Sequence, residues 1–503
     1  MLIRALILLI AASAPATTAH AAWYEASSDH FVVYADDSVA DLETFSRRME
    51  RFHSAMEVAT NTKGVKPSPS NRVTIYVVRN DREVRKLAKA VGSALAGFYT
   101  PSAGNSLVVV PRVDVHGKVT DGTMLYLLHE YVHHFNHATS SFPMPRWMGE
   151  GSAEFFASAS FEQNGDVRVG LAAQHRGYEL FQGSTVSAEE LLDPKVYEAK
   201  KGKNRGRDAF YGRSWLLYHY LTFAPEANGQ LRDYIRRMVA GEPLREAALA
   251  AFGDFGALDK ALDKYLRNKL TALAVRNAAV AESPVRIRPL TAGEIAMMPV
   301  RIQAKLGVND EEAKALVIEG RAIASQYPQD ASVLATLAEN EFDAGNDQAA
   351  IAAADRAIAL DRMQVNAYLQ KGFALFNAAS EAKEPKAIAA AYREAVRPFL
   401  ALNRMENDHP LPLIYFFRSF VDRGEQPTPL AVAGLERAAL LAPFDLGLRM
   451  NLAQQQISEG RFAAARFNLT PLAYYPHPNS ASEAAKVLLT QIEGNQDGPV
   501  AGK

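Results

Sequence analysis

Five consecutive residues of this chain combine the side chains that metal-assisted hydrolysis requires. His129 and His133 are four positions apart with Glu130 between them, in the pattern H-E-x-x-H. The apolar run 124–128 before them favours a helix, and residues four apart lie on one helix face. Two imidazoles on that face can bind one zinc ion, and Glu130 beside it can take a proton from water. The pattern alone also fits a surface helix that carries two histidines by coincidence.

A catalytic zinc site needs a third protein ligand and one open position. The chain has no cysteine, so the ligands must be histidines and carboxylates. Glu150 follows His133 with sixteen residues between them, which leaves room for a turn and an antiparallel helix that brings Glu150 to the metal. Glu154, one turn later on the same face, can accept the free ring N–H of a ligand histidine and fix its orientation.

The segment around Glu150 carries a family resemblance. The seven residues 147–153 read W-M-G-E-G-S-A. They resemble the W-L-N-E-G-F-A segment of the aminopeptidase-N family. Together with the H-E-x-x-H pattern, the chain resembles the gluzincin metallopeptidases, the clan of thermolysin and aminopeptidase N. The resemblance covers the part of the chain from about residue 100 to about residue 270.

The resemblance implies a thermolysin-like catalytic domain with one Zn²⁺ ion per chain. It implies that His129, His133 and Glu150 bind the metal and that Glu130 is the general base. Glu154 takes the place of the acid that lies one turn after the ligand in thermolysin-like enzymes. The chain lacks the G-A-M-E-N segment that helps aminopeptidases bind the amino terminus of their substrate. An endopeptidase is therefore at least as well supported as an aminopeptidase.

Hydrolysis at a carbonyl also needs a hydrogen-bond donor for the developing oxyanion. Aminopeptidase-type gluzincins supply a tyrosine hydroxyl from a helix well past the motif, in a Y-x-K-G-A segment. The segment that begins at Tyr211, 78 residues after His133, resembles it and implies that Tyr211 is this donor. Tyr218 and Tyr220 are alternatives, and Tyr211 also fits a core tyrosine on an amphipathic helix.

The N-terminus predicts export. Arg4 precedes an apolar run that extends to Ala14, and small residues stand at positions 19 and 21. This pattern is typical of a signal peptide over residues 1–21, with cleavage before Ala22, and predicts a periplasmic or secreted protein. An uncleaved N-terminal anchor is the alternative. No other stretch approaches membrane length. The net charge of −1 gives no general attraction to nucleic acid, so we expect no nucleic-acid partner.

The elements expected around the motif form an α+β fold. Strands are expected at 31–34 and 73–78, helices at 41–58 and 81–91, and a hairpin between 97 and 110. The motif helix is expected to begin at Thr120 or Asp121, either of which can cap it. The predicted boundaries are 1–21 for the signal peptide, 22–118 for a small α/β subdomain, 119–275 for a helical zinc-peptidase subdomain, 276–296 for a linker, 297–490 for an all-α solenoid and 491–503 for a disordered tail.

The solenoid is predicted from repeated small and apolar positions. Residues 331–361 carry Leu334, Ala338, Gly345 and Ala357 at the spacing of a 34-residue tetratricopeptide unit. Similar units follow, for about four or five degenerate repeats; generic helix pairs are the alternative. Such a solenoid offers a groove for a peptide or protein partner.

These patterns together predict an exported zinc metallopeptidase that cleaves a peptide or protein substrate. The tetratricopeptide-like solenoid is expected to bind that substrate or another protein partner. The alternative is an interaction scaffold whose zinc domain is inactive or structural, although Glu130 has no purpose in a purely structural site. A zinc hydrolase that acts on non-peptide amides is the third possibility.

Overall fold

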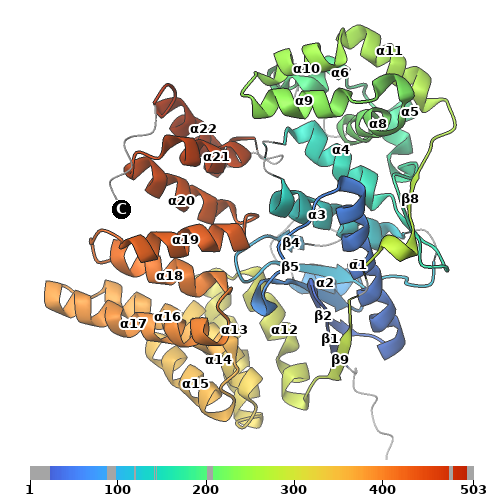
Figure 1. Ribbon diagram of the computed structural model, residues 1–503. Helices are drawn as coiled ribbons and strands as arrows, with labels where there is room; N and C mark the ends of the chain where they lie inside the picture. The colour runs from blue at the N-terminus through green and yellow to red at the C-terminus, as the bar shows by residue number, and fades with distance from the viewer. Residues whose placement is uncertain are drawn as a thin grey trace, which may run out of the picture.

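A mixed sheet, a helical region and a long series of helix pairs make up the computed structural model (Figure 1). The structure describes residues 23–87, 98–117, 120–140, 142, 144–200, 208–281, 283–474 and 480–495. The predicted signal peptide and its cleavage site lie outside the described residues, as do residues 496–503 of the predicted tail. In the described part of the chain, no helix is long and apolar enough to span a membrane.

The main sheet has six strands in the order β4-β5-β3-β2-β1-β9. Its strands are β1 (Trp23–Ser27), β2 (Phe31–Asp36), β3 (Val73–Val78), β4 (Phe98–Thr100), β5 (Leu107–Pro111) and β9 (Arg286–Pro289). The β2–β3 and β3–β5 pairs are parallel and the other pairs are antiparallel. The strands expected at 31–34 and 73–78 form, because β-branched residues fit a buried pleated surface. The expected hairpin is the β4–β5 pair, whose edge strand is β4.

Different helices cover the two faces of this sheet. Alternate residues of a strand point to opposite faces. Val33 and Ile75 share one core with α1 and α3, and their neighbours Tyr34 and Tyr76 share another with α2 and α12. These helices are α1 (Val39–Thr60), α2 (Asp81–Leu87), α3 (Gly122–Thr139) and α12 (Ala292–Leu306). The second face is therefore buried by a helix that comes after the whole helical region.

The segment 276–296, expected to be a linker, is partly built into the fold. Its strand β9 pairs with β1 from Tyr24 opposite Pro289 to Ser27 opposite Arg286. Three of the four β9 residues are exposed, so the strand has no buried alternation that would reveal it in the sequence. Backbone pairing with β1 alone defines it, and α12 follows almost at once.

Helix α3 leads into a region of helices and a small three-stranded sheet. Asp121 caps α3, as expected, and its side chain accepts a hydrogen bond from the Met124 amide at 2.7 Å. The small sheet consists of β6 (Ser160–Phe161), β7 (Val167–Val169) and β8 (Leu273–Val275). The helices are α4 (Arg146–Ala157), α5 (Gly177–Gln182), α6 (Ala188–Leu192), α7 (Pro194–Lys200), α8 (Phe210–Phe223), α9 (Gln230–Val239), α10 (Leu244–Phe252) and α11 (Phe255–Leu266).

The C-terminal part is a helical repeat of tetratricopeptide-like pairs (Figure 1). Gly345, Gly424 and Gly460 have φ near 70° to 76° in the turns after α14, α18 and α20, so the same turn recurs between paired helices. The helices are α13 (Asp310–Gln326), α14 (Ala331–Asp343), α15 (Asp347–Leu360), α16 (Val365–Ser380), α17 (Pro385–Met405), α18 (Pro410–Val421), α19 (Pro429–Leu441), α20 (Leu446–Ser458), α21 (Phe462–Ala473) and α22 (Ser480–Gln491).

The repeat helices are docked onto the region that contains the sheet and α3. The Asn71 side chain, just before β3, donates to the Leu441 carbonyl at 2.7 Å, and the Ala103 amide donates to Asp445 at 2.9 Å. The His134 ring on α3 lies 4.3 Å from the Phe444 ring, centroid to centroid. These contacts place α19 and α20 beside α3, which carries the H-E-x-x-H motif (Figure 1).

Candidate metal centre

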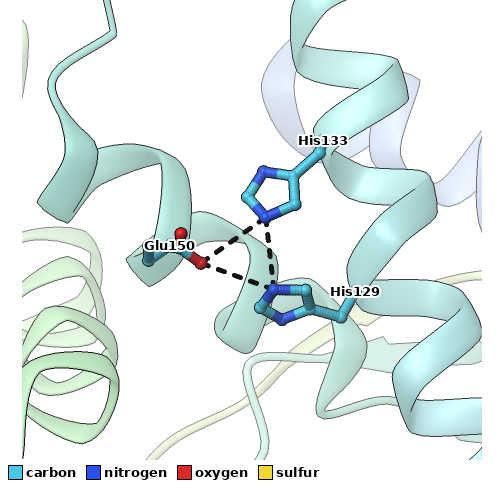
Figure 2. A group of neighbouring side chains, drawn as sticks. All are labelled: His129, His133 and Glu150. Atoms are coloured by element: carbon cyan, nitrogen blue, oxygen red, sulfur yellow. Dashed lines mark hydrogen bonds and ion pairs between the residues drawn. The ribbon is translucent and has the colours of Figure 1, made fainter. Parts of the chain in front are cut away.

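Two helices bring three potential ligands together. His129 and His133 lie one turn apart on α3, and Glu150 faces them from α4 (Figure 2). The Nε2 atoms of the two histidines are 3.2 Å apart. Glu150 Oε2 is 3.4 Å from His129 Nε2 and 3.5 Å from His133 Nε2. All three residues are buried, and in the described part of the chain they form the group that could hold a metal ion.

The spacing of these atoms fits a zinc ion. Zinc bonds nitrogen and oxygen at about 2.1 Å in tetrahedral geometry, which puts neighbouring ligand atoms about 3.4 Å apart. The 3.2 to 3.5 Å observed matches this separation, and the two contacts to Glu150 are longer than good hydrogen bonds. Two histidines and one glutamate are also a ligand set of catalytic zinc. The residues present therefore suit the metal that the motif predicts.

The electrostatics of the cluster favour a cation. Burial opposes a charge on His129, but hydrogen bonds and attraction from Glu150 and Glu154 outweigh it and raise the pKa of His129 to about 10. Burial also opposes the charge on Glu150, yet His129 and His133 hold the pKa of that carboxyl well below its ordinary value. The ionised carboxylates therefore stabilise positive charge at this position. A bound metal ion supplies such a charge.

Glu154 holds the His129 ring from the side opposite the cluster. Its Oε1 lies 3.2 Å from His129 Nδ1 and accepts a hydrogen bond of 2.6 Å from Arg176. Its Oε2 pairs with His175 Nε2. With Nδ1 turned to Glu154, His129 presents Nε2 to the metal position. The structure thus brings Glu154 to the place that the sequence predicts for it.

The partners of Glu154 were not found by sequence reasoning. His175 and Arg176 lie between β7 and α5, in a segment without helical or strand periodicity. Glu154 is fully buried, and a buried carboxylate needs an opposite charge or hydrogen-bond donors close to it. That requirement predicts partners for Glu154 but not their positions in the chain.

Tyr211 is placed beside the cluster by the first turn of α8. Its ring centroid is 6.4 Å from that of His129, and the Arg176 guanidinium carbon lies 4.8 Å from its centroid. Burial and the charge of Glu150 raise the pKa of Tyr211 to about 12, against the effect of Arg146 and Arg176. Its hydroxyl therefore stays protonated and able to donate at neutral pH.

The two alternative tyrosines on α8 pack elsewhere. Tyr218 lies against Phe155, with ring centroids 5.3 Å apart, and Tyr220 lies against Tyr265 at 5.3 Å. Of these three tyrosines, Tyr211 is the one whose ring lies next to His129, a potential metal ligand.

Glu130 follows His129 on α3 and is half-buried. It lies between α3 and the sheet, near Ile75 of β3 and Val108 of β5. Glu130 holds the place that the H-E-x-x-H pattern gives to the general base, directly after the potential ligand His129. The neighbouring His134 packs between Tyr131 and Phe444, outside the cluster.

No protein-family model matches this chain, and no curated protein matches its sequence. Among solved structures, a thermophilic TPR protein in Thermus thermophilus is 18% identical over 40% of this chain and 100% of its own, with a TM-score of 0.34. MamA from Desulfovibrio magneticus is 13% identical over 41% of this chain and 97% of its own, with a TM-score of 0.28. Such scores are too low to show a shared fold, so the repeat assignment depends on the helix pairs and turn glycines described above.

Proposed function

We propose that this protein is an exported zinc metallopeptidase of the gluzincin type. The observation that carries the proposal is the triangle of His129, His133 and Glu150 atoms at the spacing of zinc ligands. When bound there, zinc supplies a Lewis acid that activates water and polarises a peptide carbonyl. The resemblance of residues 147–153 to the aminopeptidase-N segment supports the reaction class.

The side chains around the cluster have distinct roles in this proposal. Glu130 takes a proton from the attacking water and passes it to the leaving amine. The Tyr211 hydroxyl donates a hydrogen bond to the oxyanion that develops on the carbonyl. Glu154, held by His175 and Arg176, keeps the His129 ring in the orientation that metal binding needs.

An interaction scaffold with a structural zinc site is the alternative function, and the helical repeat supports protein partners in either case. Structural zinc sites are closed by four protein ligands, whereas catalytic sites keep a position open. The cluster here contains three ligands among the described residues and has a tyrosine beside it. This arrangement favours catalysis over a purely structural role.

The test compares wild-type protein with Glu130→Gln. We expect about one zinc per chain in both, measured by elemental analysis, and cleavage of a peptide library that chelation abolishes in the wild type. Glu130→Gln should lower kcat by roughly 100-fold or more, because the carboxylate no longer accepts the proton. Glu43→Gln, an exposed change on α1, is the matched control and should leave kcat unchanged. Normal turnover by Glu130→Gln contradicts the mechanism, and zinc-loaded protein that cleaves no peptide contradicts the function.

A further inference from the structure

The repeat region places a buried guanidinium beside the metal cluster. Arg449 on α20 is 6% exposed. Its Nε donates to the Pro443 carbonyl at 2.5 Å, while its Nη1 is buried without a hydrogen-bond partner. No carboxylate pairs with Arg449 in the part of the chain that the structure describes. This is unusual, because buried charges in proteins are almost always paired.

Arg449 lines a cavity together with His133, one of the three potential metal ligands. The cavity lies between the end of α3, the start of α4 and helices α20 and α21, and its wall includes His133 and Gly149, the neighbour of Glu150. None of its lining residues in the described part of the chain is acidic, and the Asn136 side-chain amide donates to Ser152 at 2.9 Å. The space inside is about 20 Å³, enough for a group the size of one or two water molecules.

The chemistry of this cavity suits one anionic group. Burial alone lowers the pKa of Arg449, to about 10, so the side chain remains charged at neutral pH. A buried charge without a counter-charge is unfavourable until an anion neutralises it. A guanidinium matches a carboxylate in shape and can donate two parallel hydrogen bonds to it. The small volume suits a single carboxylate group.

We propose that Arg449 binds a carboxylate of the peptide substrate, so that the repeat region supplies a specificity-determining residue to the metal site. The inference rests on the proposed peptidase function. It follows from the position of the cavity, whose wall joins Arg449 to His133 and to Gly149, the neighbour of Glu150. The carboxylate comes either from the C-terminus of the substrate or from an aspartate or glutamate side chain.

Kinetics on matched peptides test this inference and distinguish the two sources. A cleaved library peptide is prepared with a free or an amidated C-terminus, and with glutamate or glutamine at each position near the cleaved bond. In wild-type, zinc-loaded full-length protein, one carboxylate form should have a kcat/KM roughly 30-fold or more above its neutral counterpart. Arg449→Met should abolish that preference and still cleave the neutral peptide. Equal preference in wild type and Arg449→Met overturns the inference, as does an absence of preference in the wild type.

Binding provides a readout that does not depend on turnover. Calorimetry with the same peptides on zinc-loaded Glu130→Gln should show tighter binding of the carboxylate form, and the added Arg449→Met change should remove that difference. Arg449→Lys, which keeps the charge but not the paired hydrogen bonds, should lose part of it. If Arg449-dependent binding persists but no variant cleaves any peptide, the peptidase function fails and the carboxylate site stands. Equal binding of both forms overturns the site.

Stability measurements separate ligand binding from a structural role. Arg449→Met should melt at or above the temperature of the wild type, because it removes an unpaired buried charge. Arg437→Met is the matched control, since Arg437 lies in the same repeats but pairs with Asp408 at the surface. It should retain the carboxylate preference in full. Loss of the preference in Arg437→Met to the same degree overturns the assignment to Arg449.

Discussion

Glu154 connects the potential ligand His129 to the side chains of His175 and Arg176. It contacts His129 on one side and His175 and Arg176 on the other, in a fully buried position. Burial opposes its charge, but these three partners hold its pKa far below the ordinary value. The carboxylate therefore stays ionised and keeps the His129 ring turned toward Glu150.

We predict that Glu154→Gln weakens zinc binding by roughly 10- to 100-fold, because the amide holds the His129 ring less firmly. Competition with a chelator of known affinity measures the change. Glu179→Gln is the matched control, because Glu179 also pairs with Arg176, at 2.7 Å, but has no contact with His129. Equal weakening in both variants would show that Arg176, and not the orientation of His129, controls affinity.

Tyr211→Phe tests the oxyanion role of the hydroxyl. We expect kcat to fall by roughly 100- to 1,000-fold, the usual effect of removing one oxyanion donor, while KM and zinc content change little. Tyr218→Phe removes a hydroxyl from the same helix, away from the cluster, and should leave kcat within a few-fold of the wild type. A Tyr211→Phe protein with wild-type kcat would remove this residue from the mechanism.

At the scale of elements, the site depends on the close approach of α4 to α8. Gly151, next to Glu150, is the contact point: a Cβ there would lie 2.4 Å from the Ser214 carbonyl oxygen and 2.9 Å from its carbon. Both are backbone atoms of α8, which cannot move without moving the helix. The missing side chain therefore allows α8 to bring Tyr211 to the metal cluster.

Gly151→Ala should consequently destabilise the fold by about 2 to 3 kcal/mol, since overpacking against a backbone cannot relax cheaply. Urea denaturation of the metal-free protein measures the free energy of unfolding. Gly122→Ala, at the first turn of α3 with no atom near the added methyl, should change it by less than about 1 kcal/mol. Similar stability of the two variants would show that α4 and α8 have more freedom than their packing indicates.

Across the whole molecule, the predicted subdomains depend on one another. Helix α12 buries one face of the sheet, β9 pairs with β1, and the repeats contact the sheet region through Asn71 and Ala103. His409 belongs to this contact: it is fully buried at the start of α18, and a Cβ on Gly104 would lie 2.9 Å from its ring. Burial lowers its pKa to about 4, against the attraction of Glu406.

This histidine makes stability depend on pH. The pKa of a histidine in the unfolded chain is about 6.5, so as the pH falls the unfolded state binds the proton before the folded state does. The contribution of His409 to the free energy of unfolding is therefore full above about pH 6.5 and decreases toward pH 4. Between pH 7.5 and 5, the free energy of unfolding of the wild type should fall by about 2 kcal/mol more than that of His409→Asn. The His409 side chain caps α18 by accepting a hydrogen bond from the Leu411 amide, and asparagine can accept this bond but does not titrate. Denaturation of metal-free protein at both pH values measures this. His116→Asn, a change at an exposed histidine, is the control and should show the same pH dependence as the wild type. Equal losses of stability in the wild type and His409→Asn would show that another group titrates.

Features that depend on local periodicity can be predicted from the sequence alone. Helical spacing puts His129 and His133 on one face of a helix, and it does the same for Glu150 and Glu154. Runs of β-branched residues predict the strands at 31–34 and 73–78. The repeats follow from small residues and turn glycines that recur along the chain. In each case the physical constraint acts between residues a few positions apart, so the chain itself records it.

The distant segments that complete these features are known from the packing of the folded chain alone. His175 and Arg176 pair with Glu154, β9 and α12 complete the sheet, and Arg449 lines the same cavity as His133. Any segment of the chain that packs at the right position can neutralise a buried charge or cover an apolar face. No spacing in the sequence specifies that segment, and only the packing of the whole chain selects it.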